Sequence, residues 1–238
     1  MTFQIFKNYD TLSQGATYAV LNLLCQKPNA TICVASGFTP SLTYKKIVQQ
    51  GRPEDFREVV FIGLDEWVGI PPHNKGSCRY FVERKLTAPL NIPAERVRFF
   101  DALAQDLEAE CERMNDFIAA RGGLDLMLVG VGLNGHIGLN EPGTPFDTYC
   151  HVSQLDPLTA TVGQKYFKSE TPLTQGITLG LRHFLEAKQA IILASGVQKA
   201  DIIQKILATP PTEALPATIY KKHPNAYLWA DRKAASYH

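Results

Sequence analysis

The stretch LDLMLVGVGLNGHIGLNEPG, residues 124–143, joins an apolar run to a loop rich in glycine. Its first part, residues 124–131, is short and apolar, which is typical of a strand buried on both faces of a parallel sheet. Its second part, residues 132–143, holds four glycines, two asparagines, a histidine and a glutamate. In open parallel sheets ligands bind beyond the carboxyl ends of the strands, so this loop is a candidate functional site.

Similar apolar runs recur along the chain and alternate with segments of helical periodicity such as residues 106–123. These runs are TICVA (31–35), VVFIGL (59–64), AIILA (190–194) and AYLWA (226–230). The alternation predicts an α/β fold with a Rossmann-like, mostly parallel sheet flanked by helices on both faces. We expect a single domain over residues 1–238, a length sufficient for one sizeable core.

The composition is that of an ordinary globular protein, with 45% hydrophobic residues and 24 Lys plus Arg against 23 Asp plus Glu. This balance gives no electrostatic reason to expect nucleic acid or a membrane surface as a partner. No apolar stretch reaches the roughly 18–20 residues that span a bilayer. The start, MTFQIFKNYD, lacks a basic segment followed by an apolar core. We therefore expect a cytoplasmic protein.

The five cysteines are odd in number and widely spaced, and none forms a C-x-x-C pair. This pattern favours neither a disulfide framework nor a zinc site. Cys25, Cys33 and Cys111 lie in apolar or helical segments and are interpreted as packing residues, while the other two are Cys78 and Cys150.

The loop at residues 132–143 combines side chains suited to proton transfer. His136 lies two residues after Asn134 and five before Glu141. Histidine exchanges protons near neutral pH, and a nearby carboxylate can orient its ring and support the imidazolium. Glycines such as Gly132 let a ligand approach the main chain. The alternative is a histidine in a tight turn; a metal site is disfavoured because no second histidine stands at helical spacing.

The loop after residues 31–35 reads SGFTPSLTYKKI and begins with Ser36 and Gly37, followed by Thr39 and Pro40. Proline suits the first turn of a helix. A hydroxyl, a close-approaching backbone and the N–H groups of a helix start could hold a phosphate. The alternative is a capped strand-to-helix turn that binds nothing, and the loop matches neither a P-loop nor a dinucleotide fingerprint.

Two adjacent carboxylates, Asp65 and Glu66, follow the run at residues 59–64. Carboxylates at the end of a buried strand are costly unless solvated, paired or used, which makes both candidates for acid–base work. A helix cap or an ion pair is the alternative.

The segment SGVQKADIIQKIL after residues 190–194 repeats the strand, glycine turn and helix design. Lys199 falls in the first turn of the expected helix, where a cation opposes the helix dipole. This placement favours a phosphate between Lys199 and the Ser36 loop. A solvated surface lysine remains the alternative.

Five segments in this order, ASGFTP, LDEWVGIP, GVGLNGHIGLNEPG, ITLGL and SGVQK, resemble the sugar-phosphate isomerases and deaminases related to glucosamine-6-phosphate deaminase. The resemblance covers nearly the whole chain. HVSQLD, residues 151–156, together with GITLGL is most similar to the galactosamine-6-phosphate isomerase (deaminating) branch.

The resemblance implies a role for each matching position. Asp65 is the proton acceptor for enolisation, and Asn134, His136 and Glu141 form the ring-opening group. The resemblance places Ser36, Gly37, Thr39 and Lys199 at the phosphate, with Lys165 at the place of a lid arginine in glucosamine enzymes. Glu66 and Gly132, considered above for their own chemistry, complete the candidates for substrate binding. Some relatives carry aspartate where Asn134 stands; an amide cannot act as a base, so Asn134 orients His136 or binds substrate.

The implied activity is aldose–ketose isomerisation with hydrolytic loss of the amine, needing no cofactor and no metal. For galactosamine 6-phosphate the products are tagatose 6-phosphate and ammonia. Glucosamine 6-phosphate, giving fructose 6-phosphate, is the alternative substrate. A 6-phosphogluconolactonase and a non-catalytic sugar-phosphate sensor are further alternatives, the first disfavoured because ester hydrolysis needs no enolising base.

The polar segment 150–174, broken by Pro157 and Pro172, is predicted to be a lid over the substrate. Galactosamine and glucosamine differ at C4, and one hydrogen bond can decide between them. His151 or Asp156 could make that bond, or could serve as a loop contact or helix cap. The sequence does not indicate the oligomeric state.

Overall fold

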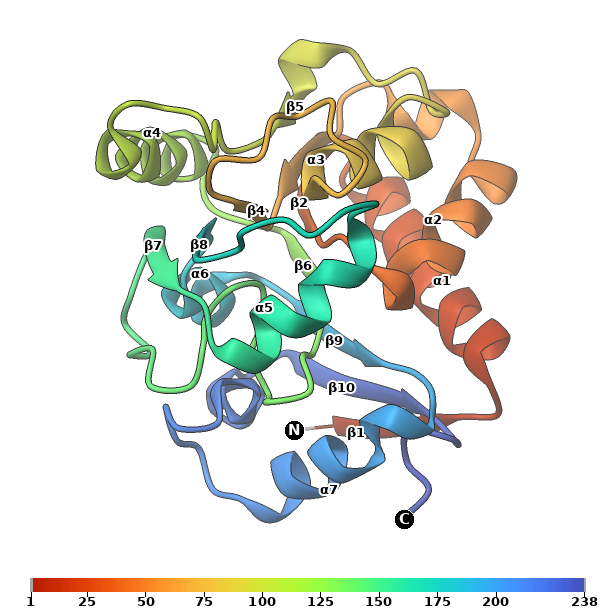
Figure 1. Cartoon of the computed structure of the whole chain (residues 1–238). Coiled ribbons are helices and arrows are strands. Elements are labelled where there is room, and N and C mark those ends of the chain that lie inside the picture. Colours follow the sequence, from red (N-terminus) through yellow and green to blue (C-terminus); the bar gives the residue numbers. More distant parts are fainter. Residues whose placement is uncertain (1, 238) are drawn as a thin grey trace.

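The computed structural model describes residues 2–237. Within them, seven parallel strands form one sheet in the order β1-β10-β9-β6-β2-β3-β5 (Figure 1). Their bounds are Thr2–Phe6 (β1), Ala226–Asp231 (β10), Ala190–Ala194 (β9), Leu126–Gly130 (β6), Thr31–Val34 (β2), Val60–Gly63 (β3) and Val97–Arg98 (β5). The predicted fold class is confirmed, and each predicted apolar run contains one strand.

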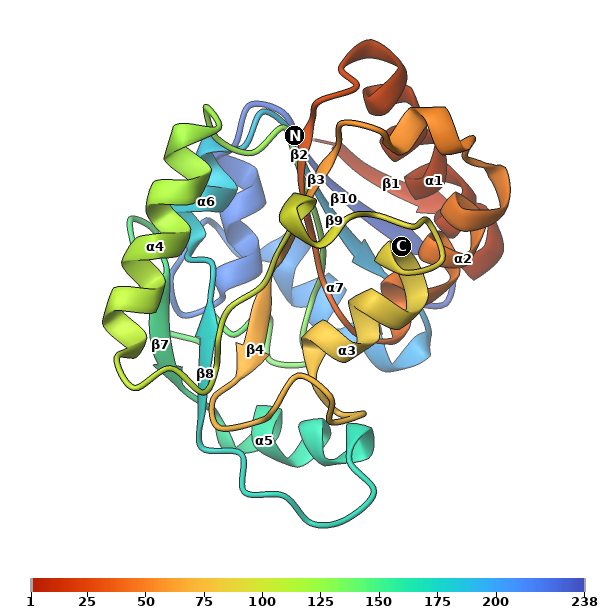
Figure 2. The ribbon, with the colours of Figure 1, turned by 90° about the horizontal axis from the view of Figure 1, so that it is seen from above.

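Helices cover both faces of this sheet, as Figure 2 shows, with α4 and α6 on one side and α1 and α2 on the other. The α-helices are α1 (Tyr9–Gln26), α2 (Phe38–Gln50), α3 (Cys78–Val82), α4 (Leu107–Ala120), α5 (Pro157–Gly163), α6 (Leu181–Glu186) and α7 (Ala200–Ala208). Shorter turns of 3₁₀- or π-helix are η1 (Pro53–Phe56), η2 (Glu83–Thr87), η3 (Ala94–Arg96), η4 (Gln164–Tyr166), η5 (Val197–Lys199) and η6 (Pro216–Lys222).

The buried side chains divide into two cores because successive residues of a strand face opposite sides of the sheet. In β6, Leu126 and Leu128 pack toward α1 and α2, whereas Met127 and Val129 pack toward α4, α6 and α7. A strand buried on both faces has no polar positions to alternate with, which explains the continuous apolar runs in the sequence.

A second sheet, of three antiparallel strands in the order β4-β8-β7, was not predicted from the sequence. Its strands are β4 (Asp65–Trp67), β8 (Gln175–Thr178) and β7 (His151–Gln154). β4 begins two residues after β3 ends, and Asp65 pairs with Thr178. The residues DEW therefore leave the main sheet and turn Asp65 toward the carboxyl ends of its strands.

The segment 150–174, predicted to be a polar lid, is ordered into β7, α5 and η4. Asp156 caps α5 by accepting a hydrogen bond from the Leu158 amide at 2.8 Å. A small apolar cluster that includes Trp67, Leu139 and Leu173 packs beside Tyr166 and Phe167. Lid motion stays a prediction.

The five cysteines are free thiols, and Cys25 is exposed at the end of α1, so its interpretation as a packing residue is wrong. Cys33 and Cys111 are buried as predicted. None of the helices in the described part of the chain is long and apolar enough to cross a membrane.

Candidate active site

A cavity of about 610 Å³ lies beyond the carboxyl ends of β2, β3, β6 and β9, with α5 and η4 on its other side. β2 and β6 are neighbours although the chain leaves them in opposite directions across the sheet, and such a switch point is where open α/β sheets bind ligands. The volume is typical of a small-molecule site. The predicted residues lining it are Ser36, Gly37, Thr39, Asp65, Gly132, Asn134, His136, Lys165 and Lys199.

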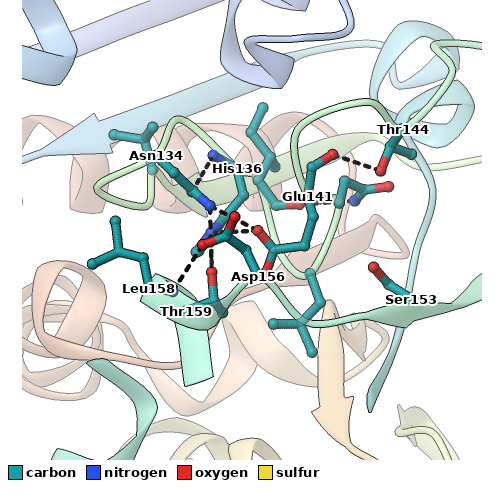
Figure 3. A network of polar contacts seen from close by, with 12 residues as sticks. Asn134, His136, Glu141, Thr144, Ser153, Asp156, Leu158 and Thr159 are labelled. Atoms are coloured by element: carbon teal, nitrogen blue, oxygen red, sulfur yellow. Dashed lines mark hydrogen bonds and ion pairs between the residues drawn. The ribbon is translucent and has the colours of Figure 1, made fainter. Parts of the chain in front are cut away.

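His136 lies within a polar network that joins the 132–143 loop to α5 (Figure 3). Its Nδ1 is 3.1 Å from Thr159 Oγ1 and 3.5 Å from Glu141 Oε2. Asn134 donates through Nδ2 to Glu141 Oε2 at 2.8 Å and accepts the His136 amide at 3.2 Å. Asn134 therefore orients the loop and the carboxylate, as expected for an amide that cannot be a base. Glu141 lies behind His136, outside the cavity lining.

Gly132 lies against the His136 ring, so a Cβ at this position would overlap the imidazole. The Gly132 amide also donates to the His136 carbonyl at 2.9 Å. The close approach of the His136 ring requires glycine at position 132, and Gly132 contributes to the site by placing this histidine.

Asp65 has the electrostatics expected of a base. Its Oδ1 is buried and has no hydrogen-bond partner among residues 2–237. Burial and the neighbouring Glu66 charge raise the pKa of Asp65 to about 7, although the Cys78 thiol opposes the shift. A carboxylate with a pKa near the working pH is the kind that enzymes use for proton abstraction.

Cys78, which the sequence analysis did not connect with the site, lines the cavity beside Asp65. Ser36 Oγ donates to its sulfur at 3.1 Å. Burial and the charges of Asp65 and Glu66 raise the pKa of the thiol well above its ordinary value, so it stays protonated and can donate to Asp65. The sequence gives little indication of this role, because a cysteine at the start of a helix is not distinguishable from a small packing residue.

Glu66 is a correction to the predicted substrate-binding set. Its side chain is 3% exposed and lies outside the cavity lining. Both oxygens are occupied: Oε1 accepts from the Trp67 and Cys78 amides at 2.9 Å, and Oε2 accepts from Ser77 Oγ at 2.6 Å and the Arg79 amide at 2.9 Å. Glu66 therefore holds the start of α3 against β4, which is the cap alternative that the sequence left open.

Part of the cavity lining is cationic, with Lys165 and Lys199. Lys199 Nζ donates to the Val131 carbonyl at 2.6 Å. Burial, and then the charge of Lys165, lower the pKa of Lys199 to about 8. A buried lysine at a helix start with a second lysine near it is unfavourable without an anion between them. The position therefore favours a bound anion over the alternative of a solvated surface lysine.

The start of α2 also lines the cavity, with Ser36, Gly37 and Thr39. Gly37 has φ +108°, in the region that favours glycine, and no side chain among the described residues caps the helix. The first N–H groups of α2 are therefore free to meet an anion at the wall formed by Ser36, Gly37 and Thr39. Tyr166 also lines this part of the cavity, and its hydroxyl lies over Gly37.

Neither residue considered for sugar selection lines the cavity. His151 Nδ1 pairs with the Tyr149 carbonyl at 3.0 Å, and Asp156 is the cap of α5. The structure thus favours the loop contact and the helix cap. Within residues 2–237, no cluster of three His, Cys, Asp or Glu side chains is arranged to hold a metal ion.

A parallel α/β fold whose switch-point cavity holds a buried carboxyl group, a histidine and two lysines is typical of the class of enzymes that act on small phosphorylated molecules. Comparison with known proteins agrees: residues 9–229 match the family described as glucosamine-6-phosphate isomerases/6-phosphogluconolactonase, and the chain belongs to this family. The membership predicted from the motifs is confirmed.

Two relatives are similar over most of their length. A glucosamine-6-phosphate deaminase of Shouchella clausii (strain KSM-K16) is 39% identical over 97% of this chain and 94% of its own. An Escherichia coli (strain K12) protein named "Putative deaminase AgaI" is 38% identical over 94% of this chain and 89% of its own.

Solved structures share the whole fold. A monomeric glucosamine-6-phosphate deaminase superposes with a TM-score of 0.96 at 31% identity, covering 100% of both chains. The 6-phosphogluconolactonase of Trypanosoma brucei has a TM-score of 0.78 at 20% identity, covering 99% of this chain and 98% of its own, which shows the fold alone.

Proposed function

We propose that this protein is a deaminating aldose–ketose isomerase that converts a 2-amino-2-deoxyhexose 6-phosphate and water into a ketohexose 6-phosphate and ammonia. The observation that carries the proposal is the pairing, in one cavity, of Asp65 and His136 with the cationic wall of Lys199 and Lys165. The first two can move protons and the other two can bind a phosphate.

The chemistry begins with ring opening. His136, held by its contacts with Thr159 and Glu141, protonates the ring oxygen of the sugar, and the C1 hydroxyl loses its proton as the aldehyde forms. The open chain then carries an aldehyde at C1 and an amine at C2.

Asp65 performs the isomerisation. Its carboxylate removes the C2 proton while O1 takes up a proton, which gives an enolamine. Asp65 then returns the proton to C1 and the nitrogen loses a proton, which leaves an imine at C2. Water adds to this imine and ammonia leaves, so the ketose phosphate forms without net oxidation. Binding the phosphate far from C1 and C2 supplies energy that places these carbons against Asp65.

Among the candidate substrates, glucosamine 6-phosphate is the first choice. It is supported by the similarity to a glucosamine-6-phosphate deaminase in sequence and to another in structure. Galactosamine 6-phosphate is the second candidate, because the HVSQLD segment resembles the galactosamine branch. With His151 and Asp156 outside the cavity lining, they provide no contact that favours galactosamine.

Lactone hydrolysis is less well supported, because it has no use for a buried carboxylate base of raised pKa. The structural similarity to lactonases concerns the fold alone at 20% identity.

The test measures ammonia release from glucosamine 6-phosphate and galactosamine 6-phosphate at matched concentrations, with 6-phosphogluconolactone hydrolysis assayed alongside. We expect ammonia from at least one amino sugar, loss of release in Asp65→Asn with binding retained, and a raised KM in Lys199→Ala. Turnover of the lactone alone, or of nothing, would overturn the proposal.

A further inference from the structure

The hydroxyl of Thr159 contacts the imidazole of His136, and the carboxylate of Glu141 faces the same ring nitrogen. Thr159 belongs to α5, outside the 132–143 loop, and its side chain is buried with 5% exposed. Its Oγ1 is 3.1 Å from His136 Nδ1 and 3.5 Å from Asn134 Nδ2 (Figure 3). The separation of 3.5 Å between His136 Nδ1 and Glu141 Oε2 is longer than an ordinary N–H···O hydrogen bond.

We propose that Thr159 is the positioning residue of the ring-opening histidine: its hydroxyl accepts a hydrogen bond from the Nδ1–H of His136 and donates a hydrogen bond to Glu141. A threonine hydroxyl can donate one hydrogen bond and accept others, so it can connect a donor to a carboxylate. With Nδ1 carrying the proton, Nε2 is the nitrogen that exchanges a proton with the sugar ring. The inference rests on the proposed function.

The charge on Glu141 agrees with this arrangement. Burial works to raise the pKa of Glu141, but contacts with His136, Thr159 and Asn134 outweigh it and hold the pKa below the ordinary value. Glu141 is therefore ionised near neutral pH and can accept a hydrogen bond from the Thr159 hydroxyl. A protonated Glu141 would compete to donate instead.

The orientation of Thr159 differs from that of a threonine that serves only its helix. Threonine in a helix commonly bonds the carbonyl four residues earlier, as Thr17 does with Ser13 at 2.8 Å. The Thr159 hydroxyl instead contacts side chains of the 132–143 loop. This contact ties α5 to the catalytic histidine rather than satisfying α5 itself.

α5 also leads directly into η4, which brings Lys165 and Tyr166 to the lining of the cavity. One segment therefore supplies a cation to the phosphate and a hydroxyl to His136. A substrate that engages Lys165 holds α5 in place, and so holds the histidine ready for ring opening.

The experiment compares Thr159→Val, which keeps the shape and removes the hydroxyl, with Thr159→Ser, which restores it. Thr161→Val is the matched control, because Thr161 is exposed on the same helix and does not line the cavity. For each protein we would measure kcat and KM for ammonia release and record the ¹⁵N shifts of the His136 ring by NMR, assigned with His136→Gln.

We expect Thr159→Val to lower kcat about 10- to 100-fold with KM within about threefold, as for loss of one hydrogen bond to a charged group. The His136 ring should lose its Nδ1–H tautomer preference, Thr159→Ser should recover both properties, and Thr161→Val should match the wild type. Unchanged kcat and unchanged ring shifts in Thr159→Val would overturn the inference. Should that variant not fold, Thr159→Ala is measured in its place.

The NMR readout separates this inference from the proposed function, because it needs no turnover. A wild type that releases no ammonia overturns the proposed function. A wild type that releases ammonia, with a His136 ring that does not respond to Thr159→Val or Thr159→Ala, overturns the role of Thr159 alone.

Discussion

At the scale of single residues, the burial of Asp65 in the candidate active site lowers the stability of the fold when this carboxyl group is ionised. An aspartate ionises near 3.8 in the unfolded chain, whereas burial and the Glu66 charge raise its pKa to about 7 in the fold. Between these values the folded state binds more protons than the unfolded state, so stability is lost as pH rises from about 4 to 7. The carboxylate is destabilised in the form that would abstract a proton.

Asp65→Asn should therefore raise the free energy of unfolding at pH 8 by about 2–4 kcal/mol, because a neutral amide escapes the penalty of a shift from 3.8 to about 7. At pH 4 the gain should be close to zero, since the wild-type carboxyl is then protonated in the fold. Urea unfolding at both pH values measures it. An equal effect at pH 4 and pH 8 would contradict the assigned electrostatics.

Gly132 provides a second prediction at this scale. Gly132→Ala places a methyl group into the His136 ring, which must rotate or shift. Displacement of a catalytic group by about 1 Å can cost about 10²-fold in rate, so we expect a fall of that size in kcat with phosphate binding preserved. Steady-state kinetics and fructose 6-phosphate binding are measured on the same variant. An unchanged kcat would contradict the prediction, because the loop would then accommodate the methyl group without displacing His136.

The sequence alone indicated those candidate site residues whose chemistry follows from the residue type and from a position soon after a buried strand. His136, Asp65 and Lys199 stand directly after buried runs, and parallel strands bring such positions to one edge. Thr159 and Cys78 could not be found in this way. The proposed role of Thr159 and the position of Cys78 depend on contacts across the fold, with His136 and Asp65, which residue type alone does not indicate.

At the scale of elements, the start of α3 depends on one carboxylate. Glu66 accepts four hydrogen bonds from Trp67, Ser77, Cys78 and Arg79. The sequence placed Glu66 with the substrate because adjacent carboxylates suggest acid–base chemistry. Alternation along β4 instead turns the two side chains in opposite directions.

Glu66→Gln should lower the free energy of unfolding by about 2–4 kcal/mol, because an amide NH₂ then faces backbone N–H groups that need an acceptor. Loss of the Glu66 charge should also shift the acid limb of kcat/KM to lower pH, since this charge raises the pKa of Asp65. Glu83→Gln is the control, as Glu83 pairs with Arg79 at the surface. A variant as stable as the wild type would remove Glu66 from the cap.

Strands were predicted correctly where both faces are buried, because these strands are continuous apolar runs. Strands without such a run were not predicted. β5 has two residues, and β1 has a mixed burial pattern at the edge of the sheet. The antiparallel sheet is short and partly polar, so β4, β7 and β8 lack a signal of their own. These strands form because β8 pairs with both β4 and β7, which are distant in the sequence.

At the scale of the whole molecule, four strands of the main sheet deliver side chains of different chemistry to one cavity. β2 leads into the Ser36 loop and β9 into Lys199, whereas β3 leads into Asp65 and β6 into the 132–143 loop. α5 and η4 close the space between them. In the proposed reaction, the binding energy of the phosphate would hold the reacting carbons against Asp65, provided that Lys199 is charged.

Binding of fructose 6-phosphate should weaken by up to about tenfold between pH 7 and pH 9. Burial and Lys165 lower the pKa of Lys199 to about 8, so the free protein loses this cation over that range. The phosphate ester is already a dianion, with a second pKa near 6. Lys199→Arg should bind with little pH dependence, because a guanidinium stays charged.

Calorimetric titration at pH 7, 8 and 9 checks this expectation. Lys205→Gln is the control, since Lys205 is exposed on α7 and does not line the cavity, and its binding should follow the wild-type pH dependence. A bound anion raises the pKa of Lys199, so protons should be taken up on binding near pH 8, and heats measured in two buffers report that uptake. Binding that is equally tight at pH 7 and pH 9, with no proton uptake, would place the phosphate away from Lys199.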